Sequence, residues 1–232
     1  MNAADVMMLN VITVSADADV RHVAKILVTN RISAVPVVDE QGKLVGIISE
    51  GDLVRRPEIG SEKPLSWWFN ALSTKDSLAE EFVRSHSRKA RDIMTRKVVT
   101  AKPDESLGHI ADLLEKNRIK RVPIVSDEKI VGIVSRSNLV QALATLVEKR
   151  EKRTESTRAS DAKLRSIVFA RLQQAPRTSR SLPNVFVHDG TVQLWGAVNS
   201  ETERKVARVA VEATPGVRCC VIDDLVVHPG GD

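Results

Sequence analysis

The chain of 232 residues has the length of one large or two small domains. Its composition, 42% hydrophobic and 28% charged with only 3% aromatic, is typical of a globular protein with an aliphatic core. No apolar run approaches the roughly 20 residues that span a bilayer, and two adjacent cysteines, Cys219 and Cys220, exclude a disulfide framework. Since no basic leader precedes the first apolar stretch, the sequence predicts a cytoplasmic protein.

The first two thirds of the chain consist of two copies of one unit. The Asp-Val-Met of residues 5–7 recurs as Asp-Ile-Met at 92–94, 87 positions later. After a slip of one residue, Gly-Ile-Ile-Ser at 46–49 returns as Gly-Ile-Val-Ser at 132–135. So many matches in register do not arise by chance, and they predict a duplicated structural unit.

Each copy predicts the element order strand, helix, strand, strand, helix. In the first copy the strands are expected at 11–14, 35–38 and 44–48, the first helix around 20–27 and the last near Asp52. In the second copy the strands are expected at 98–100, 122–125 and 130–134, the first helix around 107–114 and the last helix near Asn138. Strands that are apolar at nearly every position are typical of sheets covered on both faces, so we expect the copies to pack on each other.

This order resembles the cystathionine-β-synthase (CBS) repeat, of which a tandem pair is called a Bateman module. The resemblance also rests on a Val-Pro step at 35–36 and 122–123, and on a Gly-apolar-apolar-Ser-x-x-Asp/Asn element. It covers about residues 1–147. It implies adenine nucleotides or related adenosyl ligands bound in clefts between the repeats, no required cofactor, and a homodimer.

Ser49 and Asp52 lie three residues apart, where the last strand of the first copy leads into a helix. Both residue types commonly cap helix N-termini, where exposed N–H groups need acceptors. A carboxylate can also accept hydrogen bonds from both hydroxyls of a ribose. The residues alone favour the cap; with the repeat and the resemblance, we favour a ribose site.

The second copy differs at the equivalent positions. Asn138 replaces Asp52, and an amide has one acceptor oxygen where a carboxylate has two. The second copy also gains cations, Lys120-Arg121 and Arg136, which we expect to neutralise phosphates, although they are also consistent with a solvated surface. The expected nucleotide-binding residues are Thr13, Ser33, Ala34, Val35, Pro36, Ser49, Asp52, Thr100, Lys120, Arg121, Val122, Pro123, Ser135, Arg136 and Asn138.

Between the copies lies an expected helical insert, residues 55–89, in which Trp67 and Trp68 indicate packing first and a dimer contact or a lid second. A basic stretch at 84–102 follows and could attract phosphates or form a solvated surface. Because it contains no aromatic residue for base stacking, a nucleic-acid partner is the weaker alternative.

A charged linker is expected at 148–159, and a second domain at 160–229. The residue pattern of this domain predicts a helix, a hairpin with an Asp189-Gly190 turn, a capped helix after Ser200 and a final strand at 217–227. Gly196 should mark a bulge or a close helix approach. The αββαβ order resembles the BON domain, which implies phospholipid or other ligand binding.

The expected fold is therefore α/β (α+β): two βαββα CBS repeats packed as a pseudo-symmetric pair, plus a smaller αββαβ BON domain. The expected boundaries are 1–54 for the first repeat, 55–89 for the helical insert, 90–147 for the second repeat, 148–159 for the charged linker and 160–229 for the BON domain. No phosphate loop, nucleophile elbow or metal-ligand spacing is found, so we expect a non-catalytic sensor of adenine nucleotides. The alternative is an adaptor with empty clefts that binds phospholipid or protein.

Overall fold

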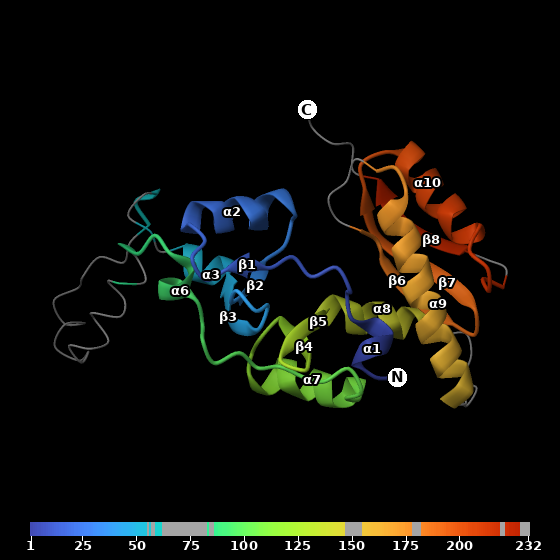
Figure 1. The fold of residues 1–232 in the computed structure, drawn as a ribbon, viewed down its shortest axis with the longest axis horizontal. Coiled ribbons are helices and arrows are strands. Elements are labelled where there is room, and N and C mark those ends of the chain that lie inside the picture. The colour runs from blue at the N-terminus through green and yellow to red at the C-terminus, as the bar shows by residue number, and fades with distance from the viewer. Residues whose placement is uncertain are drawn as a thin grey trace. The chain divides into compact units, whose positions relative to one another are not determined.

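The computed structural model describes residues 1–54, 56, 59–61, 83, 86–146, 155–177, 182–218 and 221–227 (Figure 1). The chain divides into two compact units. Residues 12–99 and 127–130 form what we call the first-repeat unit, and residues 1–11, 100–126 and 131–232 form the C-terminal unit. Most of the expected helical insert, including Trp67 and Trp68, lies outside the described residues, as do Cys219 and Cys220.

The first-repeat unit is a small sheet with helices. Its elements are β1 (Val14–Ser15), α2 (Val20–Thr29), β2 (Ala34–Val38), β3 (Leu44–Ser49), α3 (Glu50–Leu53) and α6 (Ala90–Ile93). The strand order is β1-β2-β3, with β1 parallel and β3 antiparallel to β2. The predicted helical stripe is confirmed, since Val20, Val23 and Leu27 are buried against the sheet.

Most of the second repeat lies in the C-terminal unit, together with the N-terminal segment that contains α1. Its elements are α1 (Ala3–Val6), α7 (Leu107–Lys116), β4 (Arg121–Ser126), β5 (Lys129–Ser135) and α8 (Arg136–Leu146). The strand expected at 98–100 is wrong: pairing there is reduced to one parallel bridge between Ala101 and Ile124. Pro103, which has no N–H to donate, follows two residues later and limits any extension of the pairing.

The segment that precedes each copy in sequence packs with the other copy in space. The Ala3 and Met8 amides donate to the second-repeat carbonyls of Glu105 (2.8 Å) and Ile133 (2.9 Å). In the same way, residues 90–95 bond to the first repeat, with the Thr95 amide donating to the Ile47 carbonyl at 2.9 Å. The repeated Asp-apolar-Met motif is thus the piece of chain that the two copies exchange.

The repeated glycines are explained by the same exchange. The Met7 side chain covers Gly132, and the Met94 side chain covers Gly46. A Cβ atom on either glycine would come closer than 3.0 Å to the methionine Sδ and Cγ atoms. Only glycine allows this approach, so the motif methionine and the strand glycine form one packing unit.

The BON-like region has the predicted αββαβ order. It consists of α9 (Glu155–Gln174), β6 (Asn184–His188), β7 (Thr191–Val198), α10 (Glu201–Glu212) and β8 (Val221–Val227). β6 and β7 form the predicted hairpin, in which Asp189 and Gly190 have positive φ angles of 50° and 74°, and β8 pairs parallel to β7. Val168, Leu194 and Val211 are fully or almost fully buried in its core.

Two local predictions for this region need correction. Helix α9 begins at Glu155, so residues 155–159, expected as linker, are helical. They contain neither Gly nor Pro to stop the helix, and an acidic residue in the first turn favours it. At Gly196 the strand register is continuous, so no bulge forms there. An added Cβ would lie 3.6 Å from Pro183 Cα, an ordinary contact and not a close helix approach. The glycine is required instead by its φ of 137°.

None of the helices in the described part of the chain combines the length and apolar character needed to cross a bilayer.

Candidate functional site

The turn from β3 into α3 brings Ser49 and Asp52 together in the first-repeat unit. The Oδ2 atom of Asp52 accepts hydrogen bonds from the Ser49 amide (2.8 Å) and the Ser49 hydroxyl (2.7 Å). This capping box holds the helix start, as the structural interpretation of the sequence predicts. The Asp52 side chain is half-buried at the sheet edge, so a carboxylate with about four acceptor positions borders solvent there.

Other predicted residues gather at the same edge of this sheet. Ala34 pairs with Ser49 and Val35 with Ile48, and the Ser33 carbonyl accepts from the Glu50 amide at 3.0 Å. Thr13 directly precedes β1, whose parallel register with β2 places it beside Pro36. The structure therefore brings Thr13, Ser33, Ala34, Val35, Pro36, Ser49 and Asp52 to one end of one small sheet.

The equivalent turn in the C-terminal unit has nearly the same geometry. The Oδ1 atom of Asn138 accepts from the Ser135 amide (2.8 Å) and the Ser135 hydroxyl (2.7 Å). Asn138 is only 3% exposed, and its Nδ2 atom lies 3.3 Å from Oε1 of Gln141. The amide thus reproduces the cap of the first copy, but it is buried and its donor side is directed into the protein.

The remaining predicted residues surround this second turn. The Arg136 amide donates to the Lys120 carbonyl at 3.2 Å, which repeats the Glu50–Ser33 bond of the first copy. Lys120 and Arg136 are exposed and Arg121 is half-buried, whereas Val122 and Pro123 are buried. Three cationic side chains therefore lie near the end of this sheet, and Thr100 precedes the Ala101 bridge as Thr13 precedes β1.

The basic stretch at 84–102 has contacts within the first-repeat unit. Arg91 forms an ion pair with Asp17 at 2.6 Å, and the Lys89 ammonium donates to the Asp17 carbonyl at 2.8 Å. Arg96 donates to the Arg91 carbonyl at 2.8 Å. Lys89 and Arg91 thus fasten the exchanged segment to the first repeat and Arg96 bonds within the segment, which favours the structural interpretation of the stretch.

Arg165, on α9, is a functional candidate that the sequence pattern did not identify. Its side chain is 5% exposed, and its guanidinium donates to the main-chain carbonyls of Val185 (2.6 Å), Ala4 and Met7. Burial lowers the pKa of the Arg165 guanidinium to about 10, so it remains a cation at neutral pH. The spacing 161, 165, 168, 172 defines the buried face of α9 and could have indicated the position.

A groove lies between α9 and α10 on the BON-like region. It has a volume of about 610 Å³ and an apolar wall that includes Val206, Val209 and Ala210. Arg171 and Lys205 also line it, so its chemistry is apolar with a cationic rim. Among the described residues, no group of three or more His, Cys, Asp or Glu side chains is placed to bind a metal ion.

Comparison with known families matches both halves of the chain. The CBS domain matches residues 3–58 and 90–145, and the BON domain matches residues 160–229. Uncharacterized protein MJ1426 of Methanocaldococcus jannaschii is 40% identical over 143 residues, which cover 57% of this chain and 85% of that protein.

Two further similarities concern the CBS region. Inosine-5'-monophosphate dehydrogenase of the same organism is 31% identical over 140 residues, which are 60% of this chain but only 23% of the enzyme. Among solved structures, CBSX2 in complex with AMP has a TM-score of 0.56 and 25% identity, and the match covers 63% of this chain and 99% of CBSX2.

Proposed function

Because the chain belongs to the CBS-domain proteins and carries two CBS domains followed by a BON domain, we propose that it is a non-catalytic sensor of an adenine nucleotide. The observation that carries this proposal is the Asp52 turn, where a half-buried carboxylate borders solvent at the end of the strand. The AMP complex of CBSX2 supports the ligand class.

In this proposal, Asp52 accepts hydrogen bonds from the ribose hydroxyls. Charge-assisted bonds of this kind contribute about 1.5–3 kcal/mol each, which makes Asp52 the main determinant of affinity. Thr13, Ser33 and Ser49 supply polar groups at the same sheet edge, and Val35 and Pro36 supply apolar contact. The phosphate role expected for Lys120, Arg121 and Arg136 of the second copy stays a prediction from the sequence, since cationic side chains attract anions.

The second turn suggests a sharp test, because it shows what asparagine does in this geometry. Asn138 accepts from Ser135 at the same two distances, 2.8 and 2.7 Å, at which Asp52 accepts from Ser49. Asp52→Asn should therefore keep the helix cap and remove only the charge and one ribose acceptor. We expect AMP affinity, measured by calorimetric titration, to fall at least about tenfold, which corresponds to about 1.4 kcal/mol.

The control is Asp112→Ala, which removes an exposed carboxylate whose ion pair with Lys116 is 4.0 Å long. It should leave AMP affinity unchanged, and the thermal midpoint of ligand-free Asp52→Asn should match that of the unmodified chain. If Asp52→Asn binds AMP as well as the unmodified chain does, the ribose role of Asp52 is refuted. If adenosine binds as tightly as ATP, the phosphate role of the second-copy cations is refuted.

The groove between α9 and α10 favours a second function, an adaptor that binds an anionic amphiphile through the BON domain. Its apolar wall and its cations, Arg171 and Lys205, suit an acyl chain next to a phosphate. Co-sedimentation with vesicles of anionic lipid should decrease on Lys205→Glu if this adaptor function holds. Binding to neutral vesicles alone would contradict it.

We also propose that the chain forms a homodimer through its CBS repeats. Helix α8 leaves Val140 and Leu143 each 66% exposed, three residues apart on one face, and Val28 on α2 is 79% exposed. Apolar side chains at such spacing on a helix surface are suited to a partner surface. Sedimentation equilibrium should give twice the chain mass of 25.5 kDa, and Leu143→Glu should shift it toward the monomer.

A further inference from the structure

A row of three side-chain amides runs from the second turn to the BON domain, entirely within the C-terminal unit. Asn138 Nδ2 lies 3.3 Å from Gln141 Oε1, and Asn184 Nδ2 lies 3.5 Å from the same oxygen. Asn138 and Gln141 belong to α8 of the second repeat, whereas Asn184 is the first residue of β6. Gln141 therefore joins the Ser135–Asn138 turn to a strand of another domain.

The orientation of this row follows from its first member. The Ser135 main-chain N–H can only donate, so it must meet the oxygen of the Asn138 amide, at 2.8 Å. The NH₂ group of Asn138 then faces Gln141, which must present its oxygen, and that oxygen also faces the NH₂ group of Asn184. A carboxylate at position 138 has no hydrogen to donate and could not maintain the row in this direction.

The two copies of the repeat differ at both positions that the row needs. In sequence, the first copy has Asp52 where the second has Asn138, and Arg55 where the second has Gln141. Asn138 and Asn184 are 3% and 8% exposed, so their amides have little access to water. Buried polar groups must find partners within the protein, and each unmade bond costs about 1–3 kcal/mol.

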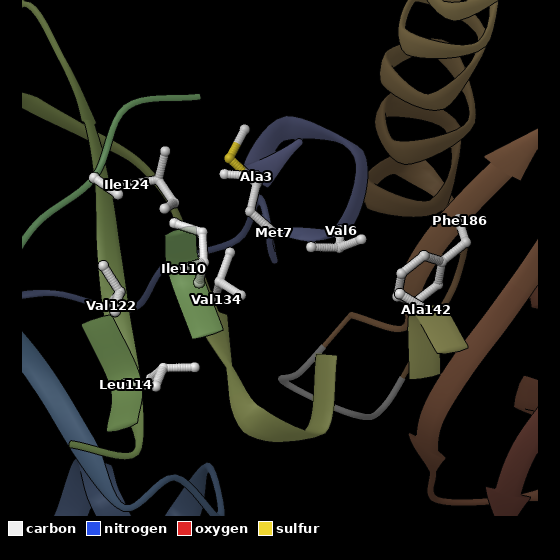
Figure 2. Packing of buried hydrophobic residues seen from close by; sticks show 11 residues of the cluster. Ala3, Val6, Met7, Ile110, Leu114, Val122, Ile124, Val134, Ala142 and Phe186 are labelled. Atoms are coloured by element: carbon white, nitrogen blue, oxygen red, sulfur yellow. The ribbon is translucent and has the colours of Figure 1, made fainter. Parts of the chain in front are cut away.

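Apolar contacts and hydrogen bonds also join the same two domains. Phe186 of β6 belongs to the hydrophobic cluster of the second repeat, together with Val6 and Ala142 (Figure 2). Arg165 of α9 bonds to the Val185 carbonyl of its own domain and to the carbonyls of Ala4 and Met7 in the N-terminal segment. The row is thus the polar centre of a buried contact between the second repeat and the BON domain.

We propose that the second turn is the docking element of the BON domain and that the ribose site belongs to the Asp52 turn alone, one per chain. Asn138 uses its oxygen on Ser135 and its NH₂ group on Gln141, so its amide holds the neighbouring domain and has no role in binding ribose. The two turns have divided their tasks: the first binds ribose and the second carries the domain that follows. The stoichiometry rests on the proposed function, whereas the docking role does not.

The docking role is tested on the full chain without ligand, by measuring the distance distribution between spin labels. The labels are attached through Lys116→Cys on α7 and Arg208→Cys on α10, both exposed, after Cys219→Ser and Cys220→Ser have removed the native thiols. The labelled chain is diluted into an excess of unlabelled chain, so that a homodimer carries labels on one copy only. Docking then predicts a single narrow distance peak.

Gln141→Leu should abolish that narrow peak, because it leaves the amides of Asn138 and Asn184 without their acceptor. Asn184→Leu should broaden the peak as well, and the two substitutions together should add little to either one, as expected for members of one network. Gln173→Leu, at an exposed amide of α9, is the matched control and should keep the narrow peak. A narrow peak in both Gln141→Leu and Asn184→Leu would overturn the docking role.

The stoichiometry is tested by calorimetric titration with AMP. One AMP should bind per chain, Asn138→Ala should leave affinity and stoichiometry unchanged, and Asp52→Asn should weaken the single site. Two AMP molecules per chain, one of them lost in Asn138→Ala, would overturn the division of tasks. If no AMP binds to the unmodified chain, the proposed function fails, and the label distances still decide the docking role independently.

Discussion

Replacing Arg165 by methionine should destabilise the C-terminal unit strongly. The methionine keeps an apolar stem of similar length but removes every donor of the guanidinium. Three main-chain carbonyls, those of Val185, Ala4 and Met7, then lose their donor at a site where Arg165 is 5% exposed.

The magnitude follows from two opposing effects. Each buried carbonyl without a donor costs about 1–3 kcal/mol, so three give a loss of several kcal/mol. Burial of the cation, which lowers the pKa of Arg165 to about 10, is relieved by the substitution and offsets part of that loss. We expect Arg165→Met to lower the free energy of unfolding by about 2–4 kcal/mol in total.

The assay is urea unfolding followed by circular dichroism. With a slope of about 1–3 kcal/mol per molar urea, the expected loss moves the transition of the C-terminal unit by about 1 M or more. Arg165→Lys should be intermediate, because a single ammonium cannot reach three carbonyls in the way a planar guanidinium does. Arg171→Met, on the exposed side of the same helix, is the control. If Arg165→Met unfolds at the same urea concentration as Arg171→Met, the reasoning about the buried arginine is refuted.

Three glycine substitutions test the packing and the backbone. Gly132→Ala should lower the free energy of unfolding by about 1–3 kcal/mol, since the new Cβ meets Met7. In a chain that also carries Met7→Ala, the loss caused by Gly132→Ala should be smaller. Equal losses with and without Met7→Ala, measured by thermal unfolding, would contradict the close contact. Gly196→Ala should cost about 1–3 kcal/mol because of its φ of 137°, although an added Cβ has ordinary space there. Gly108→Ala, at an exposed position of α7, should instead stabilise the chain by about 0.5–1 kcal/mol; the same loss at both positions would show that backbone conformation is not the cause.

Much of the fold could be predicted because its signals are local or repeated. Amphipathic spacing located α2 and α7, and the Asp189-Gly190 turn located the β6–β7 hairpin, because helix and hairpin formation depend on residues close in sequence. The match at an offset of 87 revealed the duplicated unit. The Ser49–Asp52 pair was identifiable for the same reason, since a capping box spans only four residues.

Other features were decided by contacts between distant residues. The exchange of residues 1–11 and 89–99 between the repeats depends on Met7 reaching Gly132 and Met94 reaching Gly46, which no local pattern specifies. The amide row and the Arg165 contacts join residues far apart in the chain. Helical spacing can indicate that Arg165 lies on the buried face of α9, but not which carbonyls it meets. Local sequence signals were enough for most of the helices and strands and for the side chains that cap them. Which asparagine is buried against another domain depends on contacts between distant residues, because burial is a property of the packed chain.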